Sequence, residues 1–84
     1  MWKNIDNCLQ ISLKFKDFKT AWAFMNDVAF QSETMNHHPN WENSYNLVSV
    51  KLYTHDAKNT VTEKDHQLAK AIDEILKNYQ FQVL

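Results

Sequence analysis

The sequence predicts an α+β fold in which two amphipathic helices pack on one face of a four-stranded antiparallel sheet. In two segments apolar residues alternate with polar ones, which is typical of half-buried strands. In two others apolar residues recur every three or four positions, which is typical of helices. A length of 84 residues indicates one domain, residues 1–84, whose thin core self-association would help to stabilise.

The first two strands are expected at the N-terminus. Residues 9–15 alternate between apolar and polar side chains, as a strand does when one of its faces is buried. Residues 2–5 could pair with it across Asp6-Asn7, because Asp and Asn tolerate tight turns. The apolar members of the alternating strand are Leu9, Ile11, Leu13 and Phe15.

The first helix is expected to begin after Asp17, an N-cap residue, and to run to about Asn36. Pro39 disfavours the helical conformation in the residue before it, so the helix should stop near His37. We interpret Trp22 as a core residue on the apolar face of this helix. The residues assigned to that face are Phe18, Ala21, Trp22, Met25, Val28, Ala29 and Ser32.

A second hairpin and a second helix complete the fold. The hairpin spans about residues 41–54 with its turn at Tyr45-Asn46, and Val48, Val50 and Leu52 face one way. The last helix is expected to start at Thr62, because residues 62–65 resemble a capping box in which Asp65 replaces the usual Glu. Its apolar face comprises Leu68, Ile72, Ile75, Leu76 and Tyr79.

The composition excludes several classes of protein. The chain has nine lysines, no arginine, ten acidic residues and a net charge of −1, so it lacks the basic face that nucleic-acid binding normally requires. It has no glycine, which removes the glycine-rich loops that bind nucleotide phosphates. An apolar fraction of 44% argues against disorder. We therefore expect no nucleic-acid partner and no nucleotide cofactor.

The apolar runs are also too short for a membrane span or a secretory signal peptide. Cys8 is the only cysteine, so no internal disulfide can form, which fits a reducing compartment. We interpret Cys8 as a small strand residue rather than a functional thiol. The expected location is therefore the cytoplasm.

Three histidines are the principal candidates for chemistry. If the turn lies at Tyr45-Asn46, the hairpin register places His37 and His38 opposite Thr54 and His55. Three imidazoles would then meet at the open end of the hairpin, beside a helix C-terminus that favours imidazolium. Imidazole suits proton transfer because its ordinary pKa is about 6.5.

Other interpretations of these histidines remain open. Adjacent histidines often occur as polar loop residues, and His55 could be a polar residue at a strand end. Three imidazole nitrogens could also form an open zinc site, although neighbouring residues rarely point at one metal and no H-x-x-x-H spacing is present. We expect no metal. His66, in the first turn of the last helix, is interpreted as solvated.

Four further residues are candidates near this site. Asp65 is expected to be a helix cap first and a site residue second. Glu33 precedes His37 by one helical turn and could accept a hydrogen bond from an imidazole, or could be solvated. Trp41 could form an aromatic wall for a flat ligand, or pack the hairpin. Pro39 follows the histidine pair directly.

These segments together resemble the signature of the pterin-4a-carbinolamine dehydratase family. The resemblance covers about residues 2–71 and depends chiefly on E-x-x-x-H-H-P followed by T-H. It is carried by Glu33-Thr34-Met35-Asn36-His37-His38-Pro39-Asn40-Trp41, Tyr45-Asn46, Thr54-His55-Asp56-Ala57 and Thr62-Glu63-Lys64-Asp65. Phe15-Lys16-Asp17-Phe18 and Phe24-Met25 are also similar to the family.

The resemblance implies helices packed on a four-stranded antiparallel sheet, and dehydration of 4a-hydroxytetrahydropterin to quinonoid dihydropterin. That step recycles the pterin used by aromatic amino-acid hydroxylases. His37, His38 and His55 match the family's catalytic set. The residues placed with the pterin substrate are Glu33, Pro39, Trp41, Thr54, Asp56, Ala57 and Asp65.

Two features depart from the family pattern. The sequence starts almost at its first expected strand, so we expect the fold to lack the N-terminal helix that is usual in the family. The loop from His55 to Asp65 is one residue longer than the common form and has Lys58-Asn59 where glycine is frequent. The expected assembly is a homodimer or a homotetramer. The alternative function is a non-catalytic dimerisation or pterin-binding partner.

Overall fold

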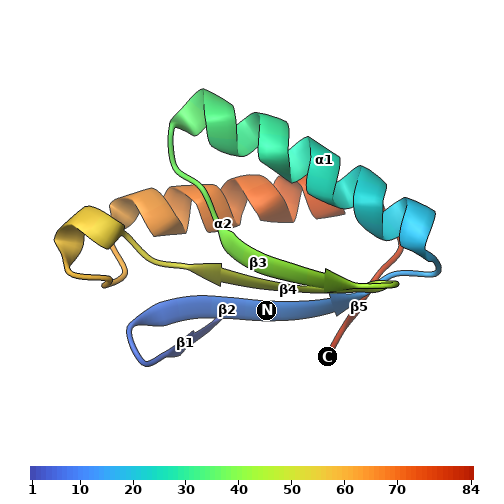
Figure 1. Ribbon diagram of the computed structural model, residues 1–84, viewed down its shortest axis with the longest axis horizontal. Coiled ribbons are helices and arrows are strands. Elements are labelled where there is room, and N and C mark those ends of the chain that lie inside the picture. The colour runs from blue at the N-terminus through green and yellow to red at the C-terminus, as the bar shows by residue number, and fades with distance from the viewer.

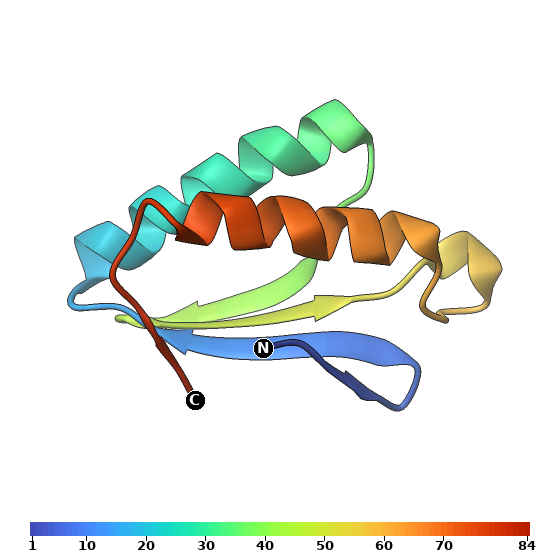
Figure 2. The ribbon, with the colours of Figure 1, turned by 180° about the vertical axis from the view of Figure 1, so that it is seen from behind.

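The computed structural model describes residues 1–84 and has the expected α+β fold. Helices α1 and α2 lie on the same face of an antiparallel sheet (Figure 1), and the view from behind shows the same two layers (Figure 2). The elements in chain order are β1 (Lys3–Ile5), β2 (Cys8–Lys14), α1 (Phe18–Met35), β3 (Asn40–Ser44), β4 (Leu47–Leu52), the 3₁₀ turn η1 (His55–Ala57), α2 (Glu63–Leu76) and β5 (Gln82–Val83). No helix is long and apolar enough to cross a membrane.

The sheet contains one strand more than the sequence predicts. Its main order is β1-β2-β4-β3, and the two-residue strand β5 pairs with β2 beyond the end of β1. Two residues are too short to show any hydrophobic period, so β5 leaves no signal in the sequence. The first hairpin turns at Asp6 and Asn7 as expected, with φ of 54° and 58°. Asp and Asn adopt this left-handed region more readily than most residues.

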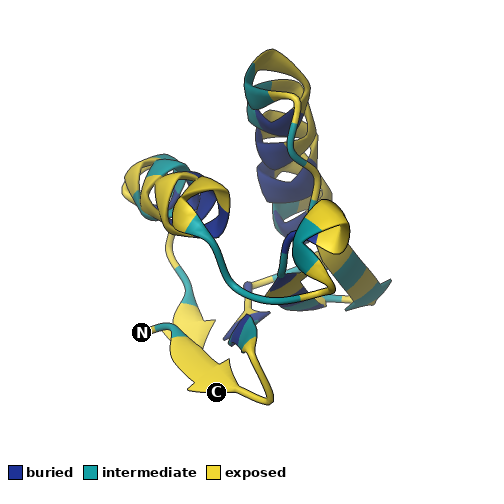
Figure 3. Ribbon diagram, turned by 90° about the vertical axis from the view of Figure 1, so that its left-hand side faces the viewer, coloured by how far each residue is buried: buried dark blue, intermediate teal, exposed yellow.

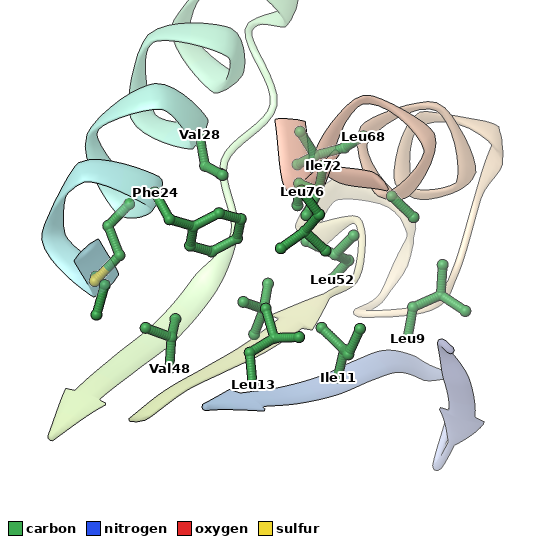
Figure 4. Packing of buried hydrophobic residues seen from close by; sticks show 14 of the residues in the cluster. Leu9, Ile11, Leu13, Phe24, Val28, Val48, Leu52, Leu68, Ile72 and Leu76 are labelled. Atoms are coloured by element: carbon green, nitrogen blue, oxygen red, sulfur yellow. The ribbon is translucent and has the colours of Figure 1, made fainter. Parts of the chain in front are cut away.

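The core lies between the sheet and the two helices. Buried residues line the inner sides of both helices (Figure 3), and the labelled side chains of β2 and β4 point toward those of α1 and α2 (Figure 4). The alternating residues of both strands are buried as expected. The fully buried side chains of this cluster include Leu13, Phe24, Val28, Val48, Val50, Leu52, Leu68 and Ile72.

The expected core role of Trp22 is wrong. Its side chain is 56% exposed, and Phe18 and Ala29 are exposed as well. Phe24 is fully buried and fills the space between α1 and the sheet. Apolar residues occur on two overlapping stripes of this helix, and a period of three to four cannot decide which stripe faces the sheet. The contacts with β4 and α2 decide it.

The expected hairpin register is also wrong by one residue. Ser44 lies opposite Leu47, and the ladder ends where Asn40 lies opposite Lys51. His37 and His38 therefore have no strand partners, and Thr54 forms an isolated bridge with Thr60 instead. A tight turn with Tyr45 at φ 51° fixes the pairing, because turn geometry sets the register of a hairpin.

The N-terminal ends of both helices have the expected caps. Asp17 Oδ1 accepts a hydrogen bond of 2.8 Å from the backbone N–H of Thr20 and caps α1. Asn36 ends α1 in the left-handed conformation, with φ 51° and ψ 41°. Thr62 is the N-cap of α2, so the helix itself begins one residue later than expected. The left-handed residue turns the chain sharply, and His37 and His38 follow it directly.

Tyr79 connects the segment after α2 to α1 through a side-chain hydrogen bond. Its Oη donates a hydrogen bond of 2.5 Å to Asp27 Oδ2, and its ring meets the edges of Phe15 and Phe24. Burial, together with the Asp27 carboxylate, raises the pKa of Tyr79 to about 12. The expected place of Tyr79 on the apolar face of the last helix is wrong, because α2 ends at Leu76 and Tyr79 lies in the segment after it. The ring nevertheless packs partly against the core.

Candidate functional site

His37, His38 and His55 line a single surface cleft of about 380 Å³. The end of α1 and the turn η1 lie at the same end of the molecule (Figure 1), and the residues that line the cleft come from the segments there. The segment after α1 supplies His37 and His38, and the first residue of η1, which follows the second hairpin, supplies His55. Its other lining residues are Asn36, Asn40 and Tyr53. The structure therefore gathers the three imidazoles even though the strand register that we expected is wrong.

His37 is anchored from behind by a buried carboxylate. Its Nε2 lies 2.6 Å from Asp65 Oδ1, the His37 side chain is 12% exposed, and that of Asp65 is fully buried. An ionised carboxylate accepts hydrogen bonds only, so His37 Nε2 carries the proton in this contact. The second nitrogen of the His37 ring, Nδ1, is therefore the one left for chemistry.

Asp65 is held by two further donors. Its Oδ2 accepts hydrogen bonds of 2.8 Å from Thr54 Oγ1 and from the backbone N–H of Thr62. Burial by itself would raise the pKa of Asp65, but the hydrogen bonds from His37, Thr62 and Thr54 together hold this pKa below its ordinary value. Asp65 therefore caps α2, as expected, and also connects the helix to the histidine cleft.

Thr54 extends this network to the end of β4. Because its hydroxyl donates to Asp65, Thr54 Oγ1 accepts from Thr62 Oγ1, which lies 2.5 Å away. The backbone N–H of Thr54 donates to the carbonyl of Thr60, which closes the loop that contains η1. The residues before and after this loop are thus fixed to one another and to His37.

His38 has a different carboxylate partner. Its Nε2 lies 2.9 Å from Glu33 Oε2, and the two side chains are 55% and 80% exposed. The sequence predicted that Glu33 could accept a hydrogen bond from an imidazole, and it does so. The partner is His38 because Asn36 turns the chain back over the last turn of the helix.

His55 pairs with an amide instead of a carboxylate. Its Nδ1 lies 3.1 Å from Asn59 Oδ1, and both residues are exposed. An amide oxygen accepts, so Nδ1 donates and Nε2 keeps its lone pair in the neutral ring. Lys58 and Asn59 both have φ of 58°, and this left-handed pair returns Asn59 toward His55.

Sequence reasoning missed four residues of this region: Asn36, Asn40, Tyr53 and Asn59. Asn59 was noted only as a departure from glycine, although its spacing of four residues from His55 across a short loop could have suggested a contact. Tyr53 continues the strand face of Lys51 and precedes His55 by two residues, which places it at the cleft once the strand end is known. Asn36 and Asn40 flank the histidine pair and could have been included for that reason.

The remaining expected site residues lie around the cleft without lining it. Thr54 and Asp65 are buried behind His37, and Trp41 packs partly against the core. Pro39 is half-buried, while Asp56 and Ala57 belong to η1. Contact of these residues and Glu33 with a substrate stays a prediction. His66 is exposed on α2, as the sequence indicated.

A metal centre and a functional thiol are the two other kinds of site that the sequence could supply. No three His, Cys, Asp or Glu side chains converge in a way that could hold a metal ion. Cys8 begins β2 and is half-buried, as expected for a strand residue. Burial raises the pKa of its thiol.

Comparison with known proteins gives consistent matches over most of the chain. The family model described as "Pterin 4 alpha carbinolamine dehydratase" matches residues 1–75. A Burkholderia pseudomallei protein named for the same activity is 51% identical over 72 residues, which cover 86% of this chain and 70% of the relative. A Christiangramia forsetii protein with the same name is 42% identical over 77 residues, covering 92% and 78%.

A solved structure shares both fold and sequence with this chain. It is the crystal structure of a protein from Brucella melitensis described as a "transcriptional coactivator/pterin dehydratase". The TM-score is 0.82 and the sequence identity is 43%, over 88% of this chain and 80% of that one. The α+β arrangement of the two helices on the sheet is therefore found in a crystal structure as well.

Proposed function

The chain belongs to the pterin-4a-carbinolamine dehydratase family, and on that premise we propose that it converts 4a-hydroxytetrahydropterin into quinonoid dihydropterin. The observation that carries the proposal is the cleft of about 380 Å³ lined by His37, His38 and His55. The relatives described above carry the name pterin-4-alpha-carbinolamine dehydratase, which denotes the loss of water from a pterin carbinolamine. The proposed physiological role is to recycle the pterin of an aromatic amino-acid hydroxylase.

The reaction needs one acid and one base. The C–O bond at the carbinolamine carbon breaks, and the hydroxyl leaves as water after it takes up a proton. The adjacent ring nitrogen loses its proton, and a C=N bond forms. The net change is the loss of one water with no change in oxidation state, so two correctly placed imidazoles supply all the proton transfers required.

We assign the base to His55. Its Nδ1 donates to the neutral Asn59 side chain, so Nε2 is left with a lone pair that can accept a proton. Because His55 is exposed at the rim of the cleft, the proton it accepts can pass directly to solvent. Asn59 is a positioning residue in this scheme, since it selects the tautomer of His55 without touching the substrate.

We assign the acid to His37. The Asp65 carboxylate and the C-terminus of α1 both offset the positive charge that this ring carries before it donates a proton. Asp65 occupies Nε2, so the proton for the leaving hydroxyl comes from Nδ1. A ring that is 12% exposed and hydrogen-bonded from behind also stays in one orientation, which favours proton transfer at a defined point.

His38 is assigned to substrate binding and polarisation. Its side chain is more exposed than that of His37. One ring nitrogen of His38 is hydrogen-bonded to Glu33, and the other is free. The planar pterin would lie against the imidazoles, with Asn36, Asn40 and Tyr53 offering hydrogen bonds at the edges of the cleft. We retain Pro39, Trp41, Thr54, Asp56 and Ala57 as proposed contributors to the shape of this site.

A dehydratase assay tests the proposal. The carbinolamine is generated in situ by a pterin-dependent hydroxylase, and formation of quinonoid dihydropterin is followed with the wild-type chain and with His38→Ala. We expect catalysis by the wild-type chain and a rate lower by about 10²-fold or more for the variant. His66→Ala, on the exposed side of α2, is the matched control and should keep full activity. Absence of wild-type turnover would contradict the proposed function.

A second role in self-association is favoured by exposed aromatic residues on α1. Phe18 and Trp22 stack with ring centroids 6.3 Å apart and interplanar angle 23°, and they are 46% and 56% exposed. We propose that this pair contributes to a homodimer or homotetramer, because exposed aromatic residues are enriched at interfaces. The Brucella relative, described as both coactivator and dehydratase, makes a non-catalytic partner role the alternative.

Analytical ultracentrifugation tests the self-association. We expect the wild-type chain to sediment as a dimer or tetramer at micromolar concentration and Trp22→Lys to shift it toward the monomer. Lys70→Ala on α2 is a control that should leave the sedimentation coefficient unchanged. A monomeric wild-type chain would contradict this role. An oligomer that lacks turnover would favour the non-catalytic alternative.

A further inference from the structure

We propose that the histidine cleft continues into a groove on the outer face of the sheet, and that this groove binds a polyhydroxyalkyl substituent of the pterin. The groove has a volume of about 430 Å³, and its lining residues are Asn40, Trp41, Glu42, Ser49, Lys51 and Tyr53. We call it the outer-face groove. The inference rests on the proposed function, because the cleft must hold the pterin ring.

The two cavities adjoin one another, because they share two lining residues. Asn40 and Tyr53 border both the histidine cleft and the outer-face groove. A ring bound against the histidines would therefore have one edge directed toward the groove. Any substituent on that edge would follow the strands instead of pointing into solvent.

The outer-face groove lies on the side of the sheet away from the helices. Val48, Val50 and Leu52 of β4 are buried against the helices, so Ser49 and Lys51, which alternate with them, face the opposite side. Asn40 pairs with Lys51, and Glu42 pairs with Ser49. Directly opposed residues share a face, so these two pairs form successive rungs of the groove floor.

The rungs have a defined order from the histidines outward. The first is Asn40 with Lys51, and the second is Glu42 with Ser49, about 7 Å farther along the strands. A short substituent would reach the first rung and a longer one the second. Neither Lys51 nor Glu42 forms an ion pair within the chain, so both charged groups are free to bind a ligand.

The mixture of groups favours a polyol over an anion or an apolar chain. Lys51 donates hydrogen bonds, Glu42 accepts them, and Asn40 and Tyr53 can do both. The Ser49 hydroxyl already pairs with Ser12 Oγ at 3.2 Å and keeps capacity for a further hydrogen bond to a ligand. Each hydroxyl of a polyol also donates and accepts, so alternating partners of this kind can satisfy it. A single lysine opposed by a carboxylate one rung away provides little net attraction for an anion.

Equilibrium binding of inert analogues tests this specificity. The probes are 7,8-dihydropterins with either a methyl group or a trihydroxypropyl group at carbon 6, titrated by calorimetry. We expect the wild-type chain to bind the trihydroxypropyl compound about 3–10-fold more tightly, since one net hydrogen bond contributes about 0.5–1.5 kcal/mol. Lys51→Met and Ser49→Ala should each lower this ratio toward one while leaving affinity for the methyl compound unchanged.

Lys14→Met is the matched control, because Lys14 lies on the same sheet face but outside the outer-face groove. It should leave the ratio at the wild-type value. Three results would overturn the inference while pterin binding persists. The wild-type chain could bind both dihydropterins equally, or Lys14→Met and Lys51→Met could change the affinity ratio equally. A dihydropterin with a carboxylate at carbon 6 could also bind more tightly than the trihydroxypropyl compound. Failure to bind either dihydropterin would instead contradict the proposed function.

Discussion

The two neighbouring histidines after α1 each pair with a carboxylate, but in opposite environments. His37 and Asp65 are separated by 2.6 Å, with side chains 12% and 0% exposed. His38 and Glu33 are separated by 2.9 Å, with side chains 55% and 80% exposed. The same chemical pair therefore occurs twice within two residues of sequence, once inside the molecule and once at its surface.

This difference indicates that burial, rather than residue type, decides how much a histidine–carboxylate pair contributes to the free energy of unfolding. An exposed ion pair is screened by water and contributes about 0–1 kcal/mol to stability. Removing one partner of a buried pair leaves a polar group without water or a partner, at a cost of about 3–5 kcal/mol. We therefore expect the Asp65 pair to hold the fold and the site, and the Glu33 pair only to adjust the site.

Removal of the Asp65 carboxylate should have the largest effect. Asp65→Ala leaves His37 Nε2, Thr54 Oγ1 and the N–H of Thr62 without their acceptor. We expect the free energy of unfolding to fall by about 3 kcal/mol, measured by urea denaturation at pH 7. Glu33→Ala is the matched control and should change it by less than about 1 kcal/mol. Equal losses for the two variants would contradict the comparison.

The histidines themselves should separate stability from turnover. His37→Ala should lower the free energy of unfolding by about 2 kcal/mol, because it leaves a buried carboxylate oxygen unpaired, and should also lower turnover. His38→Ala and His55→Ala should lower turnover by about 10²-fold or more with little effect on unfolding. The measurements are the dehydratase assay and urea denaturation of each variant. Full turnover by the folded His38 and His55 variants would contradict the assignment of the site.

The pH dependence of the free energy of unfolding should reveal the stabilising contribution of the buried Asp65 carboxylate. The pKa of Asp65 is lower in the folded chain than its ordinary value of about 3.9, so its ionised form stabilises the fold. This contribution is complete above pH 4 and is lost as the pH falls through the depressed folded pKa. We expect the stability difference between wild type and Asp65→Asn to narrow from pH 5 to pH 2, measured by thermal unfolding. A constant difference over this range would refute the coupling.

Giving His55 a carboxylate partner should produce the smallest effect. Asn59→Asp places a negative charge beside a ring that now pairs with an amide. An opposite charge favours the protonated ring, so the acidic limb of the pH profile of kcat/KM should move to higher pH. Because the site is exposed, we expect a shift of less than about one pH unit. Asn59→Gln keeps the amide and is the control; an unshifted Asn59→Asp profile would exclude His55 as the base.

Local pattern predicted much of the fold. The alternation of Leu9, Ile11 and Leu13 identified β2, and Pro39 located the end of α1. These features could be predicted because they depend on the backbone and on neighbours in sequence. The same local rule failed for Trp22, because two apolar stripes overlap on α1 and only contact with the sheet selects one.

The candidate site was predicted in composition but not in arrangement. The histidines stood out as residue types suited to proton transfer, and Asp65 stood out as a cap. The partners of the histidines depend on tertiary geometry, because a left-handed residue and a one-residue change in register direct the side chains. Asp65 binds His37, Glu33 binds His38 and Asn59 binds His55. Such partners are separated by up to 28 residues, so no local period reveals them.

By itself, then, the sequence determined the order of the two helices and of every strand except β5, the caps at which the helices begin and the set of imidazoles available for chemistry. The tertiary structure decided which face of α1 is buried, which strand register the tight turn at Tyr45 allows, and which histidine has its carboxylate inside the molecule. The physical reason is that propensity and capping act over a few residues, whereas burial depends on all the elements packed together. For His37 and His38, that burial is what distinguishes two adjacent residues of the same type.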